Sequence, residues 1–549
     1  VMTVTPSAPQ DPSTAQYAYL NRRTAAADVD NVALVYPFGC NASQKLAVQR
    51  ALGNRVSVVE GPPGTGKTQT ILNIVANLLM QGKTVGVVSN NNAAVDNVRD
   101  KLSKYEYGAL MAELGNRTRR QAFFADKQQD FMPDPTWRLP AEERTALRTR
   151  LGELSAAIDE LFRVNAELAD LRTKRSYAQC EYRHLLWEQP LDEARMRRVD
   201  RCFFRPIDSR RALSFRHLVT ERWQGGRPSL ALRAGLLFRC GAWPGKRLFA
   251  DAELLPAYAD RKFYETYIAE LSARIARLGA PSDEQRAKSL IEAYGKVSEA
   301  LFRDMLYRKY ERLNEARQEE RPPFTMQNYR THFRTFVERY PVVLSTTHSL
   351  CASIGAGHLL DYVIIDESSQ VDILTAAVCC ACCRNIIIIG DSRQLPHIVE
   401  EQLRAKAEEL RDKHRVPDAY DYVRQNILSS FKRVFGERLP VTLLREHSRC
   451  HPLIIDFCNR KYYRNELLIM TEPKGDYPFT VLTTTASKTY SHNGRIYNQR
   501  QIDATCDWIE RQHTEYAAMR FASDAKRESP AERIAERLIG GILAEEDRF

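Results

Sequence analysis

Eight residues between a short apolar run and a longer helix-forming run have the types and spacing that bind phosphate. The glycines of GPPGTGKT let the backbone curl so that N–H groups point inward, and the following helix adds its positive dipole end. The lysine can reach the outer phosphates of a nucleotide, and the next threonine can ligate Mg²⁺. The alternative, a glycine-rich turn without a ligand, is disfavoured by the flanking strand and helix patterns. The predicted phosphate-binding residues are Gly61, Pro62, Pro63, Gly64, Thr65, Gly66, Lys67 and Thr68.

Two carboxylates end a second apolar run, YVIIDE at 362–367. Asp366 suits a metal ion, and Glu367 is placed to accept a proton from an attacking water. A plain helix cap is the alternative interpretation of paired acids at a strand end. With the phosphate loop upstream, the pair predicts a Mg²⁺-dependent nucleoside triphosphatase in which Lys67 and Glu367 are catalytic.

A glutamine follows a third apolar run, in IIIIGDSRQLPHIV at 386–399. The carboxyl ends of parallel strands line the ligand crevice of a sheet. We therefore expect Gln394 to lie at the γ-phosphate edge beside Asp366 and Glu367. A neutral amide there can hydrogen-bond phosphate or water and so respond to the presence of the phosphate.

The elements that must position these residues alternate between buried strands and helices. Strand patterns at 56–60, 84–89, 342–346, 362–367 and 385–391 are separated by helical patterns or by the long intervening segment. Near-continuous apolar strands of this kind predict an α/β fold with a doubly wound parallel sheet.

Roughly 235 residues with a helical pattern interrupt that alternation between 105 and 340. Two heptad-spaced runs in this insertion can pair as an antiparallel coiled coil, or can lie separately as amphipathic helices on a globular core. The sequence leaves both readings open. The heptad positions are Leu151, Leu154, Ile158, Leu161, Asn165 and Leu168 in the first run, and Ile268, Leu271, Ile275 and Leu278 in the second.

The charge of the chain is concentrated in the same insertion. The net charge is +11, and residues 171–250 hold 18 Lys/Arg against 7 Asp/Glu. Arginine interleaved with phenylalanine and tryptophan there can hold a nucleic-acid backbone and stack bases, or can be an ordinary solvated surface. The segment is also a candidate surface for a protein partner.

Twelve cysteines without a framework spacing, and a start that does not look like an export signal, predict a cytoplasmic protein with reduced thiols. The cluster CCACCR at 379–384 is more typical of small core thiols than of a zinc site. No apolar run is long enough to span a bilayer, so no membrane partner is expected.

Six stretches in a fixed order resemble the motifs of superfamily 1 helicases. DESSQ (366–370), GDSRQLP (390–396) and HSRCHPLIIDFCNRKYY (447–463) look like motifs II, III and IV. NASQKLAV, VVSNNNAAVDNV and VVLSTTHSL resemble the Q motif and motifs Ia and Ic of the branch that holds the nonsense-mediated-decay helicase and senataxin.

The resemblance implies a RecA-like P-loop domain that uses ATP and Mg²⁺. It implies that Gln44 reads the adenine edge and that Gln394 couples the γ-phosphate to nucleic acid. Arg449 matches the motif IV arginine, which reaches the nucleotide from a second RecA-like domain; a fixed guanidinium suits the charge of a transferring phosphoryl group. Asn90, Asn91, Thr346 and Thr347 would face a nucleic-acid backbone, or are simple loop residues.

The sequence departs from the helicase pattern after residue 500. Neither a TVDxxQG-like nor a VAxTRA-like stretch is found there, and HSR replaces the usual QYR at 447–449. We therefore expect a partial second RecA-like domain, in which fast hydrolysis is in doubt because it needs two closing domains. That part of the chain also predicts a strand at 479–485 and a helix at 498–512. The predicted divisions are a loosely ordered lead-in at 1–36, the P-loop domain at 37–104 and 341–436, the helical insertion at 105–340, and the partial second domain at 437–549.

The sequence as a whole predicts an ATP-dependent helicase or translocase, complete or incomplete, acting on single-stranded DNA or RNA. A nucleic-acid-binding ATP switch without unwinding activity is the second hypothesis, and a P-loop ATPase indifferent to nucleic acid is the third.

Overall fold

The structure is a computed structural model, and it forms two compact units, Val1–Glu472 and Pro473–Phe549. All six helicase-like stretches lie in the first unit. The described residues are 11–23, 27, 33–125, 131–188, 192–220, 227–250, 252–278, 281–315, 324–471, 483–485, 489–492 and 495–520.

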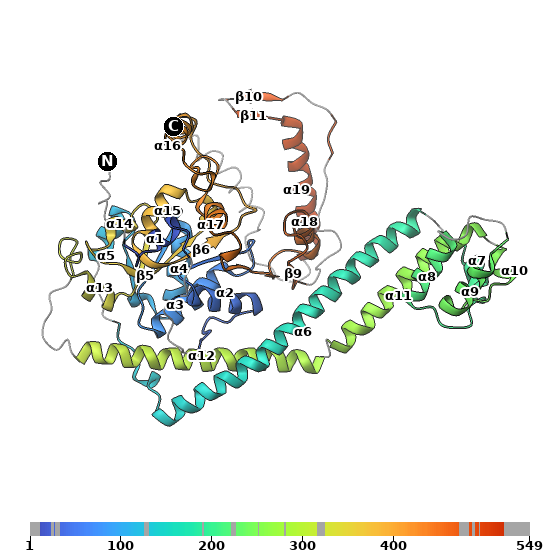
Figure 1. The fold of residues 1–549 in the computed structure, drawn as a ribbon, viewed down its shortest axis with the longest axis horizontal. Coiled ribbons are helices and arrows are strands. Elements are labelled where there is room, and N and C mark those ends of the chain that lie inside the picture. The colour runs from blue at the N-terminus through green and yellow to red at the C-terminus, as the bar shows by residue number, and fades with distance from the viewer. Residues whose placement is uncertain are drawn as a thin grey trace. The chain divides into compact units, whose positions relative to one another are not determined.

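A seven-stranded sheet, parallel at every pairing, lies at the centre of the first unit (Figure 1). Its order is β3-β4-β2-β5-β6-β1-β7, so all carboxyl ends lie at one edge. The predicted α/β fold with a parallel sheet is thereby confirmed. The strands are β1 (Val56–Glu60), β2 (Val85–Ser89), β3 (Met111–Glu113), β4 (Val342–Thr346), β5 (Leu360–Asp366), β6 (Cys383–Gly390) and β7 (Val441–Leu443).

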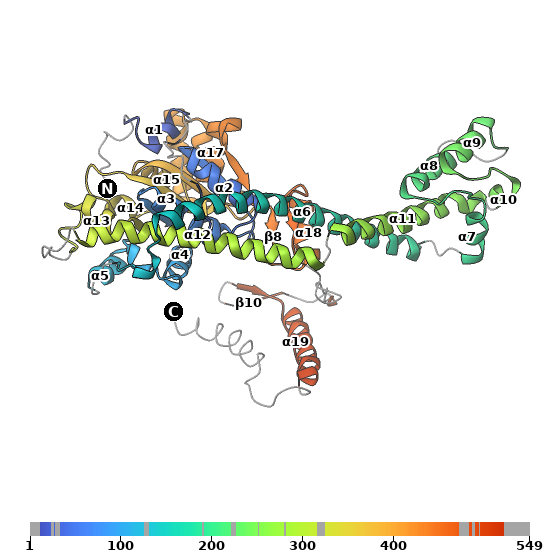
Figure 2. The same ribbon diagram turned by 90° about the horizontal axis from the view of Figure 1, so that it is seen from below.

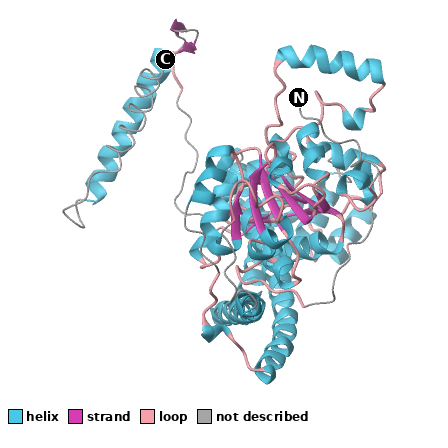
Figure 3. Cartoon of the chain, turned by 90° about the vertical axis from the view of Figure 1, so that its left-hand side faces the viewer, coloured by secondary structure: helices cyan, strands magenta, loops and turns pink. Residues whose placement is uncertain are grey.

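Helices cover both faces of the sheet, as Figure 3 shows. The isoleucines of β6 explain the continuous apolar run: Ile387 and Ile389 belong to one core cluster, and Ile386 and Ile388 to the other. Outside the insertion, the helices with buried residues in the first cluster are α2 (Ala42–Gly53), α3 (Lys67–Met80) and α4 (Asn92–Lys104). Those with buried residues in the second are α1 (Ala15–Leu20), α13 (Phe333–Arg339), α14 (Leu350–Ser353), α15 (Ile373–Cys380) and α17 (Ile427–Phe435).

The insertion is helical, as predicted, and is built on three long helices (Figures 1 and 2). Near its start, α6 packs its buried leucines into the first core cluster, together with α12. Farther along, α6 lies beside α11. α6 thus packs on the globular core near its start and beside another long helix farther along. The coiled coil itself stays a prediction. The three helices are α6 (Ala141–Glu188), α11 (Leu255–Leu278) and α12 (Pro281–Glu315).

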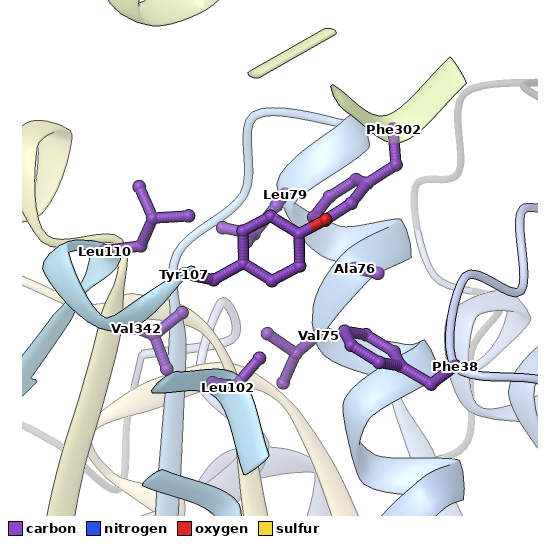
Figure 4. A pocket seen from close by; sticks show the side chains of 9 residues that line it. All are labelled: Phe38, Val75, Ala76, Leu79, Leu102, Tyr107, Leu110, Phe302 and Val342. Carbon is purple, nitrogen blue, oxygen red and sulfur yellow. The ribbon is translucent and has the colours of Figure 1, made fainter. Parts of the chain in front are cut away.

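Figure 4 shows where the insertion meets the P-loop domain. An apolar gap of about 10 Å³ lies among α3, α4 and α12, with room for no more than a water molecule. It is a packing gap, and its lining joins Phe302 of α12 to the core around α3. The lining residues are Phe38, Val75, Ala76, Leu79, Leu102, Tyr107, Leu110, Phe302 and Val342.

Between α6 and α11, a small helical cluster has an apolar core of its own; we call residues 192–259 the tip cluster (Figure 2). Buried side chains such as Phe215, Leu236 and Tyr258 form that core. Its elements are α7 (Glu193–Asp200), α8 (Ser209–Thr220), α9 (Leu230–Gly235), a π-helix (Leu236–Cys240) and α10 (Lys246–Phe249).

The chain after 436 begins within the first unit. β7, which we assigned by sequence to the second domain, pairs with β1 in the central sheet, and β8 pairs in parallel with β9. The domain divisions stay predictions, but this pairing joins the motif IV segment directly to the P-loop strand. The remaining elements here are β8 (Glu446–His447), α18 (Pro452–Tyr462) and β9 (Leu468–Ile469); α5 (Arg117–Ala125) and α16 (Glu401–His414) lie earlier in the chain.

The second unit, where described, holds an antiparallel pair, β10 (Tyr490–His492) and β11 (Arg495–Tyr497), before α19 (Gln499–Arg520). The predicted helix is therefore present, whereas most of the strand predicted at 479–485 falls outside the described residues.

The described residues 11–23 of the lead-in contain a short helix that packs on the core. This helix, α1, buries Tyr19, whose ring stacks on Phe431 at 4.5 Å between centroids. An aromatic ring packed in the core fixes this part of the chain. No strong periodicity in the sequence predicted this packing. Across the part of the chain that the structure describes, no helix combines the length and apolarity needed to cross a membrane.

Candidate nucleotide-binding site

The P-loop leaves the carboxyl end of β1 and enters α3 at Lys67. Gly64 and Gly66 have φ angles of +89° and +84°, which side chains with a Cβ rarely adopt. Space is short as well, because a Cβ on Gly66 would collide with the amide of Gln44. The Thr65 hydroxyl donates to the carbonyl of Pro62 at 2.8 Å and closes the turn. The loop therefore has the tight curl that the sequence predicted.

The predicted lysine and carboxylates come together at this edge of the sheet. The Lys67 Nζ lies 3.3 Å from the Glu367 Oε1, and the Lys67 side chain is only 10% exposed. Glu367 itself has a positive φ of +50°, which places it in the left-handed region next to the end of β5. Its N–H donates to the Asp366 carboxylate at 2.9 Å. The Lys67 ammonium thus lies beside the two neighbouring carboxylates.

The electrostatics of this pair fit a divalent cation. Burial, and next the Glu367 charge, raise the pKa of Asp366 to about 6, against the opposing effect of Lys67. Within the described residues the Glu367 Oε2 is buried and accepts no hydrogen bond. Hard cations such as Mg²⁺ bind oxygen ligands of this type. Asp366, with the hydroxyl of Thr68 at the start of α3, is therefore suited to hold the metal ion.

The pH dependence of stability tests the buried state of Asp366. The folded pKa of about 6 lies above the reference value of 3.8, so between these pH values the folded chain binds more protons than the unfolded one. Stability from this group is therefore lost as pH rises through that window. We expect Asp366→Asn, without Mg²⁺, to raise the free energy of unfolding by about 3 kcal/mol at pH 8 and by about half as much at pH 5, as measured by urea denaturation.

Asp418→Asn is the matched control, because Asp418 is an exposed aspartate in the same unit. We expect that variant to stay within about 0.5 kcal/mol of the wild type at both pH values. A lower stability of Asp366→Asn than of wild type at pH 8 would contradict the buried, destabilising carboxylate.

Gln44 is buried against the P-loop. Its Nε2 donates to the carbonyl of Thr65 at 3.1 Å, and its Oε1 accepts from the N–H of Asn41 at 3.1 Å in a capping box at the start of α2. The expected adenine contact stays a prediction. In this structure the amide supports the loop that would bind the phosphates.

The segment that resembles motif IV lies directly on the P-loop. A Cβ on Gly64 would be 2.6 Å from the Cβ of Arg449 and 2.9 Å from the Nε2 of His447. The N–H of Ser448 also donates to the carbonyl of Gly64, at 3.3 Å. The structure thus brings Arg449 to the loop that holds Lys67, while its side chain is exposed.

His447 is a contact that the sequence did not predict. It is fully buried, and burial lowers its pKa, as does the charge of Arg449. A neutral imidazole therefore packs on Gly64 where the helicase pattern has a glutamine. The only signal in the sequence was the departure of HSR from QYR.

Gln394 forms a hydrogen bond to a nearby aspartate. Its Nε2 donates to the Asp391 Oδ2 at 3.1 Å, and the same oxygen accepts from the Tyr463 hydroxyl at 2.7 Å. Asp391 thereby ties the loop after β6 to the end of α18, a role that the sequence analysis missed although Asp391 directly follows the strand. The predicted contact of Gln394 with a γ-phosphate stays a prediction.

The four residues expected to face a nucleic-acid strand differ in how far they are exposed. Asn91 caps α4 by accepting from the N–H of Ala93 at 2.9 Å, and Thr347 is buried. Asn90 is exposed, and Thr346 is half-buried at the end of β4. Asn90, Asn91 and Thr346 therefore keep exposed surface at the carboxyl edge of the sheet, whereas Thr347 does not.

The long helix α6 contacts elements on two sides of the site. The Lys45 ammonium, next to Gln44, lies 2.6 Å from the Asp159 carboxylate of α6. The Tyr177 hydroxyl, farther along α6, hydrogen-bonds to Asp456 of α18. The guanidinium of Arg460 also lies 5.0 Å from the Tyr177 ring centre. The insertion is thus attached both to the Q-motif-like helix and to the helix that follows Arg449.

The cysteine cluster lies in the core rather than at the site. All four cysteines are buried between α15 and β6. Within the described residues, no group of three or more potential ligands is arranged to hold a metal ion.

The sheet order, the loop after β1 and the carboxylates after β5 together define a P-loop nucleoside-triphosphate-binding protein. The chain matches the AAA domain family over residues 39–402, well over half of its length, and it belongs to that family. It is also a distant homologue of superfamily 1 helicases, as its similarity to several of them indicates.

Three relatives illustrate that similarity. An uncharacterized ATP-dependent helicase of Mycoplasma genitalium, MG140, is 22% identical over 84% of this chain and 48% of its own length. The DNA polymerase alpha-associated DNA helicase A of Schizosaccharomyces pombe is 33% identical over 21% of this chain and 18% of its own. A putative regulator of nonsense transcripts 1 from Takifugu rubripes is 33% identical over 24% of this chain and 12% of its own. The chain thus spans about half or less of the length of these relatives.

Proposed function

We propose that this chain is an ATP-dependent helicase or translocase that moves on single-stranded DNA or RNA. The observation that carries the proposal is the contact of Arg449 with the P-loop at Gly64. An arginine beside a phosphate loop is an arrangement for hydrolysis, because its guanidinium can stabilise charge on a transferring phosphoryl group. A site built only to hold nucleotide does not need it.

Each residue has a defined task in this proposal. The backbone of residues 61–66 binds the phosphates, and Lys67 leaves Glu367 to contact them. Asp366 and Thr68 hold Mg²⁺, which neutralises charge on the phosphate oxygens when it is bound. Glu367, freed from Lys67, accepts a proton from the attacking water, and Arg449 stabilises the charge that develops opposite Lys67.

Nucleic acid is proposed as the partner on two grounds. Two of the relatives described above are named a DNA helicase and a regulator of nonsense transcripts, so both nucleic acids are candidates. In this chain, Asn90 and Thr346 offer polar side chains at the carboxyl edge of the sheet, where a sugar–phosphate backbone can be held without reading bases.

The test measures ATP hydrolysis with and without a single strand, followed by strand separation on a tailed duplex. We expect a 30-nucleotide strand of DNA or RNA to stimulate hydrolysis by about tenfold or more, because closure of the site around ATP would be coupled to strand binding. Separated strands should appear only when ATP and Mg²⁺ are both present.

Two other outcomes would lead to the alternative functions. ATP-dependent strand binding without strand separation would support the nucleic-acid-binding ATP switch and contradict the helicase. Hydrolysis unchanged by either nucleic acid would contradict both and leave a P-loop ATPase of another kind.

A further inference from the structure

Two exposed aromatic residues, Phe204 and Trp243, lie on two backbone segments of the tip cluster that are joined by a bridge. An antiparallel bridge pairs Phe203 with Ala242, and the N–H of Phe204 donates to the carbonyl of Gly241 at 2.9 Å. Phe203 and Ala242 pack against the core of the tip cluster, whereas Phe204 and Trp243, the residues that follow them in the chain, are exposed. The exposed fractions are 55% for Phe204 and 66% for Trp243, large values for aromatic residues.

The bridge beneath these rings is held firmly by the core. The Phe203 ring packs on Phe215 and Tyr258 at centroid distances of 5.2 and 5.9 Å, and the Tyr258 hydroxyl donates to Asp200 at 2.7 Å. Ala242 is completely buried. The outer rings therefore need little ordering before they bind a flat ligand, which favours binding.

Two arginines lie close to this bridge. The Arg205 guanidinium lies 5.8 Å from the Phe204 ring centre. Arg247 acts electrostatically on Cys202, the residue opposite Trp243 across the bridge. Over residues 192–250 the sequence has 14 Lys/Arg against 5 Asp/Glu. This surface therefore attracts a polyanion.

The nearby acids do not weaken that attraction much. An open pocket of about 470 Å³ beside Phe204 and Arg205 is lined in part by Asp200 and Glu265. Lys262 lies 3.2 Å from the first of these carboxylates and 3.3 Å from the second. Arg261 also lies 2.9 Å from Glu265, so each of the two carboxylates has a cationic partner.

We propose that the surface formed by Phe204, Arg205 and Trp243 binds single-stranded nucleic acid by stacking unpaired bases on the two rings while arginines hold the backbone. A duplex hides its base faces, and an acidic peptide offers charge without regular flat rings, so a single strand fits this combination best. The proposal rests on the proposed function for the identity of the ligand, but it does not require ATP hydrolysis.

The experiment measures binding of the full chain to fluorescein-labelled dT30 and rU30 by fluorescence anisotropy, without nucleotide. Stacking on an aromatic side chain contributes enough that Trp243→Ala should weaken single-strand binding by about five- to tenfold, and Phe204→Ala/Trp243→Ala by more than about tenfold. Trp243→Phe keeps an aromatic face and should recover most of the lost affinity. A larger effect on one of the two oligonucleotides identifies the preferred nucleic acid.

Trp187→Ala is the matched control, because Trp187 is 81% exposed on α6 but outside this surface. It should bind within about twofold of the wild type, and the double variant should bind a 30-base-pair duplex almost as wild type does. Unchanged single-strand binding by the double variant, or an equal loss on duplex, would overturn the proposal, provided that circular dichroism shows a folded chain. Lys67→Ala separates this site from the proposed motor: it should stop hydrolysis and leave the effect of Trp243→Ala intact.

Discussion

Replacing Lys67 with alanine is expected to reduce ATP hydrolysis by at least about 10²-fold, because the outer phosphates lose a charged partner. The ammonium is almost buried and lies 3.3 Å from Glu367, in the position where a nucleotide's outer phosphates would compete for it. Without it, the outer phosphates and the Glu367 carboxylate lose the ammonium that would lie between them. Phosphate release at saturating ATP, with single strand present, measures the effect.

Lys104→Ala is the control, because Lys104 is an exposed lysine of the same domain, at the C-terminal end of α4. We expect its activity to stay within about twofold of the wild type, as is usual for surface substitutions. A Lys67→Ala chain that keeps a tenth or more of wild-type hydrolysis would rule out phosphate binding by this loop.

Replacing Arg449 with alanine is expected to lower kcat on the order of 10³-fold while leaving ATP affinity within about threefold. The residue lies against Gly64 but its side chain is exposed, so it is near the phosphates without being committed to another partner in the core. A group that acts mainly on the transition state affects kcat and hardly affects binding. Single-turnover hydrolysis and binding of a non-hydrolysable ATP analogue measure the two quantities separately.

Arg445 offers a matched control in the same segment, because its guanidinium donates to the carbonyl of Glu466 at 2.7 Å and so points away from the loop. Arg445→Ala should keep kcat within about threefold. Arg449→Lys should recover only part of the lost rate, because lysine lacks the planar fork of donors. Equal losses in Arg445→Ala and Arg449→Ala would indicate that the segment supports the fold rather than the reaction.

Local patterns made the sheet and the P-loop predictable. Apolar runs bounded by glycine or acids predicted five strands within two residues of those observed, since burial on both faces leaves a continuous signature. The short strand β3 was not predicted, because it lies in the segment assigned to the helical insertion. The glycines of residues 61–66 were equally informative, because the positive φ angles at Gly64 and Gly66 restrict the residue types. Lys67 and Glu367 could be placed together because carboxyl ends of parallel strands meet at one edge.

Contacts between distant polar residues were not predictable. The pairs Lys45–Asp159 and Tyr177–Asp456 join segments more than a hundred residues apart, and a single charged or hydroxyl side chain leaves no periodic pattern. The same holds for the hydrogen bond of Tyr463 to Asp391, which joins residues 72 positions apart. The three-residue strand β7 was also assigned to another domain, because so short a strand has no pattern of its own.

The contacts of α6 have a mechanical consequence. Asp159 and Tyr177 are about 27 Å apart along this helix, at roughly 1.5 Å per residue, and each is fixed to an element on a different side of the nucleotide loop. A stiff rod between two such anchor points acts as a spacer of set length. If the distance between α2 and α18 increases, one of these two contacts must therefore break or α6 must move with them. In the second case α6 would rotate as a rigid body. A small displacement at the nucleotide would then become a larger one at the far end of α6, where the basic helices of the tip cluster begin.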